Sequence, residues 1–308
     1  MSDQAALMLA YEYKTQFRFQ AQQMPSKLEG SVIRGMTDGQ KTRHELLGKV
    51  TPVERTGRHQ DTPYTPTPHD DRWSVSRNFG ASDLIDKFDK LRSKVGDPNG
   101  AYAKVQVAAL NRQKDSLIIS ALGGTAVTGQ TGTGTSSFDA NFQVAVDSHT
   151  YDEAGGTGNA GLTYYKILEA LAALEGASGD GDGRTLHGLM GAREKNTLIA
   201  STKTSSTLYV GSDEATAFRT GKIRELLGIQ WHLLEDSLIT TDSSDSRLIY
   251  LWYEDAATLD MNEDLTVSID KRADKWNAWQ ILTDWTMGSV RLDNSKVAEI
   301  ACHATTLL

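Results

Sequence analysis

The sequence predicts an α+β protein that forms one large or two smaller domains. Three observations support this class. The stretch from Asp97 to Thr125 has the length and the end signals of one long helix. Gly-rich turns, a further helix and short apolar runs follow it, and the chain ends in segments that alternate apolar and polar side chains. A chain of 308 residues is also long enough to bury a substantial core.

The composition excludes several functional classes. The formal net charge is −8, whereas general nucleic-acid binding depends mainly on Lys and Arg. Cys302 is the only cysteine, which excludes an internal disulfide and a thiolate metal cluster and fits a reducing compartment. The first residues lack the basic flank and the apolar core of a signal peptide. The sequence contains no run of about 18 apolar residues, so no membrane-spanning helix is predicted.

Two segments near the N-terminus are not expected to fold alone. Residues 1–30 are rich in Gln and aromatic side chains without a helical period, which predicts an extended arm that lies on another surface. Thr51–Asp71 carries four of the six prolines and almost no aliphatic side chains. It cannot bury enough surface to offset an ordering cost of roughly 1–2 kcal/mol per residue. The flanking segments Leu46–Val53 and Arg72–Val75 predict a long two-stranded hairpin, which a partner molecule is expected to order.

The long helix is predicted from its two ends and from one face. Asp97 suits the N-cap, Pro98 suits the first turn, and Gly123 with Gly124 would supply a left-handed stop. About 25 helical residues would make a rod roughly 37 Å long. The face expected to pack inward consists of residues at spacings of three and four: Val105, Ala108, Ala109, Arg112, Ser116, Ile119 and Leu122.

The rest of the chain is expected to alternate short helices with strands. Leu162–Leu174 predicts a helix with Thr163 as its cap, Leu162 and Ile167 stapled across the cap, and Gly176 at its end. Further short helices are expected at residues 81–95, with Ser82 as the cap, and at Arg219–Leu227. Strands are expected at Phe142–Val146, Thr197–Ala200, Leu208–Val210, Ile229–Leu234 and Leu248–Tyr253.

The C-terminal part is predicted to be rich in strands. Leu265, Val267 and Ile269 alternate with polar residues, as in a half-buried strand. A charged turn at Lys271–Lys275 leads into a long strand from Trp276 to Met287. One face of that strand would carry Trp279, Ile281, Trp285 and Met287. After a turn at Asp293–Ser295, a last strand is expected at Val297–Cys302.

No motif predicts an active site, so the chain is not expected to be an enzyme, and no catalytic, cofactor-binding or metal-binding residue is assigned. Gly124–Gly129 matches the first half of a phosphate loop. However, Gln130 and Thr131 stand where Lys and Ser or Thr are required, and a helix rather than a strand precedes the segment, which favours a simple turn. Asp180 and Asp182 lack the remaining ligands of a calcium loop and are interpreted as part of a flexible surface loop.

Histidines and tryptophans are the other candidates for chemistry. His59, His69, Asp70 and Asp71 lie close enough in sequence for a metal site or a pH switch. Without a second ligand pair they are interpreted as solvated loop residues. The remaining candidates are His187, His232 and His303, which are isolated in the sequence, and Trp276, Trp279 and Trp285, which could stack a sugar or a base. A sheet face buried in a core is the favoured interpretation of the three tryptophans.

Two groups of residues are similar to a known family. The first is Asp83-Leu-Ile-Asp86, Asp89, Arg92, Asp97-Pro98, Tyr102, Arg112, Asp115, Ile118-Ile119, Ala121, Gly124-Thr-Ala126 and Thr128-Gly129. The second is the ending Gly288-Ser-Val-Arg291-Leu with Val297-Ala-Glu-Ile300. Together with the order of arm, loop, long helix, α+β block and final strands, they resemble the major capsid proteins of tailed bacteriophages with the Hong Kong 97-type fold.

The resemblance implies a Hong Kong 97-like capsid fold with five parts. These are an N-terminal arm at 1–32, an extended E-loop hairpin region at 33–80, a P-domain with a long spine helix and sheet at 81–126, an α+β A-domain at 127–262, and closing strands at 263–308 that return to the P-domain and the A-domain. The implied function is self-assembly into the icosahedral head shell around double-stranded DNA. Such a protein needs no cofactor, is part of the virion, and is assembled in the cytoplasm of the bacterial host.

The resemblance also implies partners. These are copies of the chain in pentamers and hexamers, a portal, a decoration protein, a separate scaffolding protein, and packaged DNA that is contacted weakly; no membrane is implied. Some family members cross-link subunits through a Lys on the E-loop, but Thr51–Asp71 contains no Lys, so a non-covalent shell is expected. An encapsulin-like nanocompartment shell and a phage tail or decoration protein remain as alternatives.

Overall fold

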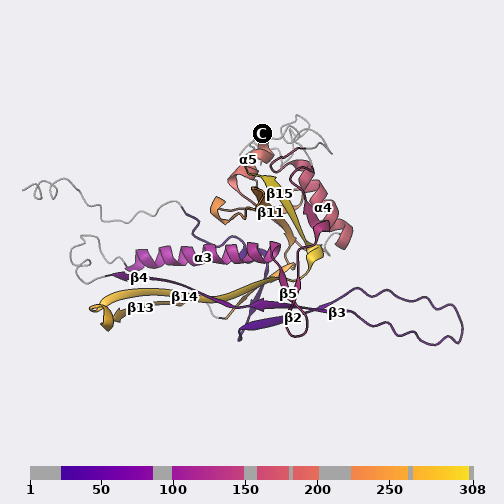
Figure 1. Ribbon diagram of the computed structural model, residues 1–308, viewed down its shortest axis with the longest axis horizontal. Helices are drawn as coiled ribbons and strands as arrows, with labels where there is room; N and C mark the ends of the chain where they lie inside the picture. The colour runs from indigo at the N-terminus through magenta and orange to yellow at the C-terminus, as the bar shows by residue number, and fades with distance from the viewer. Residues whose placement is uncertain are drawn as a thin grey trace, which may run out of the picture. The chain divides into compact units, whose positions relative to one another are not determined.

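The computed structural model describes residues 22–85, 99–148, 158–179, 183–200, 223–262 and 266–304 (Figure 1). The described part is mixed α+β, as predicted, and falls into two compact units. Unit 1 comprises Met1–Ser26, Asn78–Gln113 and Glu263–Thr286. Unit 2 comprises Lys27–Arg77, Lys114–Asn262 and Met287–Leu308. None of the described helices is long and apolar enough to span a membrane.

Unit 1 is built around a long strand. In this unit β14 (Ala278–Arg291) pairs with β13 (Thr266–Arg272) in an antiparallel hairpin and also with β4 (Arg77–Ile85). The first half of α3 (Asn99–Gly123) packs on these strands, where the Gln106 side chain donates to the carbonyl of Ile281 at 3.4 Å. Buried side chains of β14 therefore face the helix, as a half-buried strand should.

Unit 2 contains a six-stranded sheet with the order β7-β15-β11-β8-β10-β9. Its strands are β7 (Gln143–Val144), β8 (Leu186–Met190), β9 (Glu225–Leu226), β10 (Ile229–Leu233), β11 (Ser246–Tyr253) and β15 (Val297–His303). Helix α4 (Tyr164–Ser178) packs against β15, and α5 (Ala192–Ala200) follows β8. The core here is apolar, since Leu189, Ile249 and Ile300 are fully buried.

Two smaller groups of strands complete unit 2. Strand β1 (Ile33–Met36) pairs in parallel with β12 (Ala257–Met261), and β12 pairs with the last five residues of β14. A four-stranded sheet has the order β2-β3-β5-β6, formed by β2 (Lys41–Leu47), β3 (His69–Val75), β5 (Ala126–Thr128) and β6 (Gly134–Ser136). Short 3₁₀ turns lie at Glu29–Ser31, Ala140–Phe142, Asp236–Leu238, Ala273–Lys275 and Asn294–Lys296.

The predicted long helix is confirmed, but its end differs from the prediction. Neither Gly123 nor Gly124 has a positive φ, so no left-handed stop is present there. Glycine is required for close approach instead, because a Cβ on Gly123 would lie 2.0 Å from the Tyr250 hydroxyl. The predicted face is also partly wrong, since Val105 is 40% exposed whereas Asp115 is fully buried. The predicted cap residues Asp97 and Pro98 lie outside the described residues.

Asp115 is buried because it holds the last part of the predicted arm. Within unit 2 its carboxylate accepts the backbone N–H groups of Lys27 at 3.0 Å and Leu28 at 3.2 Å. Within unit 1 the arm residues next to this segment bind α3, since Arg112 donates to the side chain of Gln22 at 2.8 Å and Asn111 to the carbonyl of Met24. Residues 1–21 lie outside the described part. The described end of the arm is therefore held by polar contacts of the long helix.

Three predicted elements are wrong where the structure describes them. Ser82–Ile85 of the predicted helix at 81–95 belongs to β4, because pairing with β14 outweighs the local helical pattern. Thr197–Ala200 ends α5, where the Thr197 hydroxyl donates to the carbonyl of Arg193 one turn earlier. Instead of a helix, Glu225–Leu226 forms β9, and left-handed Leu227 and Gly228 make its tight turn to β10.

Other predictions are confirmed with shifted ends. Thr163 caps α4 by accepting from the backbone N–H of Lys166, but the helix ends at Gly179, which has a positive φ, rather than at Gly176. The strands predicted at 229–234, 248–253, 265–269, 276–287 and 297–302 correspond to β10, β11, β13, β14 and β15. The strand predicted at Phe142–Val146 is reduced to the two residues of β7. Leu208–Val210 lies outside the described residues.

Candidate functional site

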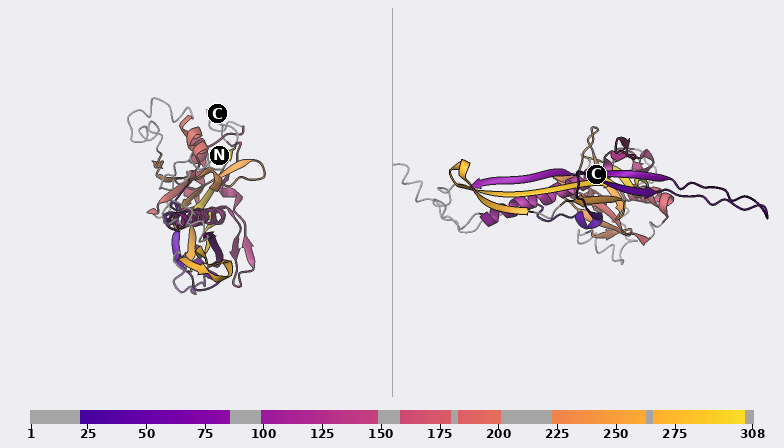
Figure 2. Two further views of the ribbon diagram at one scale, coloured as in Figure 1. Left: turned by 90° about the vertical axis from the view of Figure 1, so that its left-hand side faces the viewer. Right: turned by 90° about the horizontal axis from the view of Figure 1, so that it is seen from below.

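The feature most open to a partner is the hairpin of β2 and β3. The strands pair in antiparallel register from Lys41 opposite Val75 to Leu47 opposite His69. The predicted hairpin is therefore confirmed, but its first arm is β2 rather than Leu46–Val53, and its second arm begins at His69 rather than at Arg72. Beyond them the backbone N–H of Gly48 donates to the carbonyl of Pro68 at 2.8 Å. Residues 48–68, here called the hairpin loop, contain no helix or strand and extend past the ends of β2 and β3 (Figure 2).

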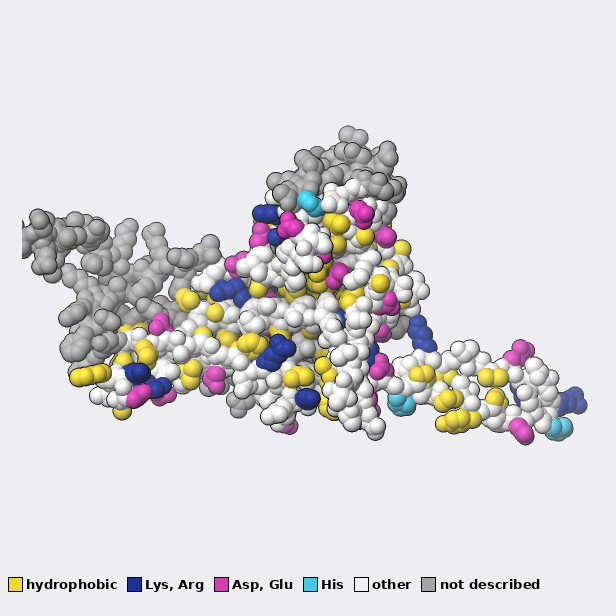
Figure 3. All heavy atoms as spheres, viewed as in Figure 1, with side chains coloured by type: hydrophobic (Ala, Val, Ile, Leu, Met, Phe, Trp, Pro, Cys, Tyr) yellow, Lys and Arg dark blue, Asp and Glu magenta, His cyan; other side chains and the backbone are white. Residues whose placement is uncertain are grey.

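Apolar side chains of the hairpin loop are exposed. Tyr64 is 90% exposed and Val53 58% exposed, and Figure 3 shows yellow atoms on the part of the loop nearer the strands, with charged side chains at its tip. The hydrogen bonds of the loop tip are local, such as that from the Thr56 backbone N–H to the Gln60 side chain at 3.0 Å. A segment that exposes such residues and leaves most of its backbone without ladder pairing gains stability when another surface covers it.

The polar residues at the base of the hairpin are paired with each other rather than arranged around a metal. Asp71 binds Arg43 across the hairpin at 3.0 Å, and Asp70 binds Arg72 at 2.5 Å. His59 lies on the hairpin loop, and His69 begins β3. Among the described residues no three His, Cys, Asp or Glu side chains are placed to hold a metal ion. Asp180 and Asp182 lie outside the described residues.

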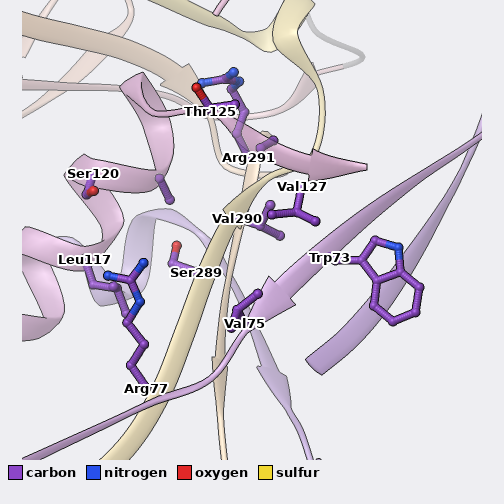
Figure 4. Close-up of a pocket in the computed structure, with 12 residues that line it drawn as sticks. Trp73, Val75, Arg77, Leu117, Ser120, Thr125, Val127, Ser289, Val290 and Arg291 are labelled. Carbon is purple, nitrogen blue, oxygen red and sulfur yellow. The ribbon is translucent and has the colours of Figure 1, made fainter. Parts of the chain in front are cut away.

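The glycine-rich stretch does not form a phosphate site. Residues 126–128 are strand β5, which pairs with β6, and no helix begins there as a phosphate loop requires. A pocket of about 120 Å³ lies beside it between α3, β3, β5 and β14 (Figure 4). Its lining contains Arg77, Arg291, hydroxyl groups and apolar side chains, but no carboxylate, imidazole or thiol. The pocket therefore carries no group suited to general acid–base catalysis at neutral pH.

Two histidines that are isolated in the sequence are brought together by the sheet. Nδ1 of His187 on β8 lies 3.2 Å from Nε2 of His232 on β10, and both rings lie near that of Trp252 on β11. Burial, and to a smaller extent the neighbouring His232, together lower the pKa of His187 to about 4 against an opposing effect of Glu254. Burial also lowers the pKa of His232, where Asp115 acts in the opposite direction to Lys27.

The paired histidines are expected to make the folded chain sensitive to acid. Because their pKa values are lower in the folded than in the unfolded chain, the unfolded chain binds more protons between pH 6.5 and about 4. Stability should therefore be full above pH 6.5 and fall as the pH drops through this window. Urea unfolding at several pH values measures this slope, and His187→Phe should flatten it whereas His59→Phe should not. An unchanged slope in His187→Phe would contradict the assignment.

The remaining candidates occupy different environments. Cys302 is fully buried, and burial raises the pKa of its thiol to about 12, so it is not a reactive thiolate. Trp285 is buried as expected, and Lys271 lies over the ring of Trp279 at 4.7 Å. The expectation for Trp276 is wrong, because it precedes β14 in a left-handed conformation and is 93% exposed.

Comparison with models of protein families shows to which family the chain belongs. A model of the family described as phage capsid protein matches residues 5–304 of the chain. The chain belongs to the phage capsid protein family. It is a major capsid protein, a structural component of the virion that forms the head shell. No curated protein sequence matches this chain.

Solved capsid structures share the fold of this capsid protein. The capsid of cyanophage Pam1 superposes with a TM-score of 0.69 at 15% sequence identity, covering 96% of this chain and 96% of that one. The capsid of Ralstonia phage GP4 gives a TM-score of 0.70 at 11% identity, covering 96% and 95%. The capsid of Helicobacter pylori bacteriophage KHP30 gives 0.70 at 11% identity, covering 96% of each chain.

Proposed function

We propose that the hairpin loop of this capsid protein lies on a neighbouring copy of the chain and holds the head shell together. The observation that carries the proposal is the loop itself, which exposes Val53 and Tyr64 and makes mainly local hydrogen bonds. A lone hairpin is marginally stable in water, so a surface that covers it contributes to its order. Heterologous contacts of this kind, repeated around closed rings, build shells from identical subunits.

The proposal extends to the parts of the fold. In it, residues 1–32 are the N-terminal arm, 33–80 the E-loop region, 81–126 the P-domain, 127–262 the A-domain and 263–308 the closing strands. The length of α3 and its packing on β14 support a spine helix on a sheet, as in a Hong Kong 97-type P-domain. The six-stranded sheet with α4 supports an α+β A-domain.

The shell is proposed to consist of pentamers and hexamers around double-stranded DNA. The net charge of −8 supports weak contact with the packaged genome, because strong binding would need many Lys and Arg side chains facing phosphates. A separate scaffolding protein, a portal and a decoration protein complete the proposed set of partners, and assembly takes place in the cytoplasm of the host. The encapsulin-like alternative would be favoured by finding protein rather than DNA inside purified particles.

Shortening the hairpin loop tests the proposal. Replacing residues 50–66 with a short Gly/Ser turn should leave the fold intact, because nothing in the core of either unit comes from this segment. Sedimentation and negative-stain microscopy should then show loss of closed particles. Tyr64→Ser should weaken assembly, and His59→Ser serves as its matched control on the same loop. Normal particles from the shortened chain would overturn the proposal.

The shell is also expected to be held without covalent cross-links. The segment Thr51–Asp71 contains no Lys that could form an isopeptide bond with a neighbour, and Lys49 at the base of the hairpin loop donates to the carbonyl of Ala177 at 2.9 Å. Boiling purified particles in detergent should therefore release single chains on a denaturing gel. A ladder of covalent oligomers that survives boiling would contradict this expectation.

A further inference from the structure

Three residues form a row across the strands beneath the hairpin. Gly35 on β1 is opposite Asp260 on β12, and Asp260 is opposite Gly288 on β14. Residues opposite each other in neighbouring strands present their side chains on the same face of a sheet. A buried aspartate is therefore flanked on both sides by positions without a side chain. Gly35, Asp260 and Gly288 are called the crossing row below.

The hairpin lies directly on the crossing row. Nε2 of His44 on β2 is 2.9 Å from Oδ2 of Asp260. At the other end of the row, a Cβ on Gly288 would lie 2.7 Å from the Ser74 hydroxyl and 2.8 Å from the Val75 carbonyl oxygen, both on β3. Both strands of the hairpin thus touch the row, one through a side-chain hydrogen bond and the other through close backbone approach.

The two glycines are required by this geometry rather than by backbone conformation. Neither has a positive φ. A Cβ on Gly35 would lie 2.1 Å from Oδ1 of Asp260, so any larger residue there would displace the carboxylate that meets His44. A Cβ on Gly288 would displace β3 itself. Each position therefore controls one side of the contact with the hairpin, without touching the hairpin loop.

The contact at the crossing row itself is polar, and beside it Leu46 of β2 packs against the buried apolar cluster of Ala126, Val290 and Leu292. Asp260 is fully buried, and neither its Oδ1 nor the Ser74 hydroxyl has a hydrogen-bond partner in the described part of the chain. At the row itself, the contact of His44 with Asp260 and the close approach at Gly288 constrain one strand of the hairpin each. Further support comes from β3 pairing with β5 and from the Ser76 hydroxyl, which lies 3.3 Å from the Asn262 side chain.

We infer that the crossing row sets the direction in which the hairpin leaves the subunit, and that it thereby determines the curvature of the assembled shell. This inference rests on the proposed function of the hairpin loop as the contact to a second copy. A chain of 14 residues, the separation of His44 from the middle of the loop, spans at most about 46 Å. A tilt of about 5° at the row would then move the loop tip by roughly 4 Å, which is enough to shift its contact on the neighbour.

The experiment changes the row and leaves the loop unaltered. Gly288→Ala and Gly35→Ala, expressed as full chains with the same assembly partners, should give folded subunits but at least about a tenfold loss in closed particles of the wild-type diameter. Open sheets or particles of other diameters should appear instead in electron micrographs. Gly30→Ala is the matched control, because no atom lies within 4 Å of a Cβ built there. It should assemble as the unmodified chain does.

A second pair of variants covers the case in which Gly288→Ala does not fold. His44→Ala removes the contact of β2 with the row and should give irregular particles, whereas His44→Gln keeps a donor there and should restore much of the wild-type diameter. Wild-type diameters and yields from folded His44→Ala and Gly35→Ala chains would overturn the inference. If the shortened loop still assembled normally, the proposed function would fail. If the shortened-loop variant lost its particles while the variants of the crossing row and of His44 assembled normally, only the inference would be overturned.

Discussion

Replacing Arg247 with Met is expected to destabilise the capsid subunit by about 3–5 kcal/mol, because a buried carboxylate would lose its charged partner. Arg247 on β11 donates through Nε to Glu194 on α5 at 2.5 Å and through Nη2 at 3.3 Å. Both side chains are buried. A third group, the half-exposed Asp236, meets Nη2 at 3.0 Å. Urea unfolding of the unassembled chain measures the loss.

A double replacement separates the charge from the packing. In Arg247→Met with Glu194→Leu no buried charge of the pair is left alone, so most of the lost stability should return. Arg184→Met is the exposed control, since its pair with Glu254 is surrounded by solvent and should contribute little. The explanation would be wrong if the double replacement were as unstable as Arg247→Met, because packing would then account for the loss.

Arg291→Met is expected to lower stability by roughly 2–4 kcal/mol, since it leaves several buried acceptors without their donor. The fully buried Arg291 donates through Nη1 to the carbonyls of Leu122 and Gly124, at the end of α3. Its Nε donates to Asn294 at 2.7 Å. Burial lowers its pKa to about 10, which leaves it charged at neutral pH, where a cation also favours a helix C-terminus.

Arg291→Lys tests whether charge or shape matters. A lysine keeps the positive charge near the helix end but lacks the planar group that reaches Asn294 and both carbonyls together, so it should recover only part of the stability. Thermal and urea unfolding of the same unassembled chains provide the comparison. A Met variant that unfolds at the wild-type urea concentration would show that the helix end does not depend on this residue.

Local sequence signals were sufficient where a segment needs no distant partner. The long apolar repeat predicted the presence of α3, although not all of its buried face, and the Thr163 cap predicted the start of α4. The prolines predicted a loop without regular structure, which ends where β3 begins at His69. These signals failed where pairing between distant strands outweighs propensity, as in β4, which is drawn into the sheet by β14.

The residues at the hairpin contact had no such signal. Asp260 and Gly288 lie 28 positions apart, and His44 lies 216 positions before Asp260, so no spacing in the sequence relates them. The pairing of His187 with His232 was missed for the same reason, because parallel strands β8 and β10 bring together residues 45 positions apart. The spacing of residues in a sequence identifies a site only when a single helix, strand or loop supplies all of the side chains of that site.

The sequence by itself determined that this capsid protein has a long helix, an exposed loop that cannot bury itself, and strands at its C-terminus. Only the tertiary structure decided which glycines permit close backbone approach, which charges are buried in pairs, and where the hairpin rests on the sheet. The physical reason is that propensity and capping act over one or two turns of chain. Burial and close approach depend instead on strands that sequence order does not place side by side.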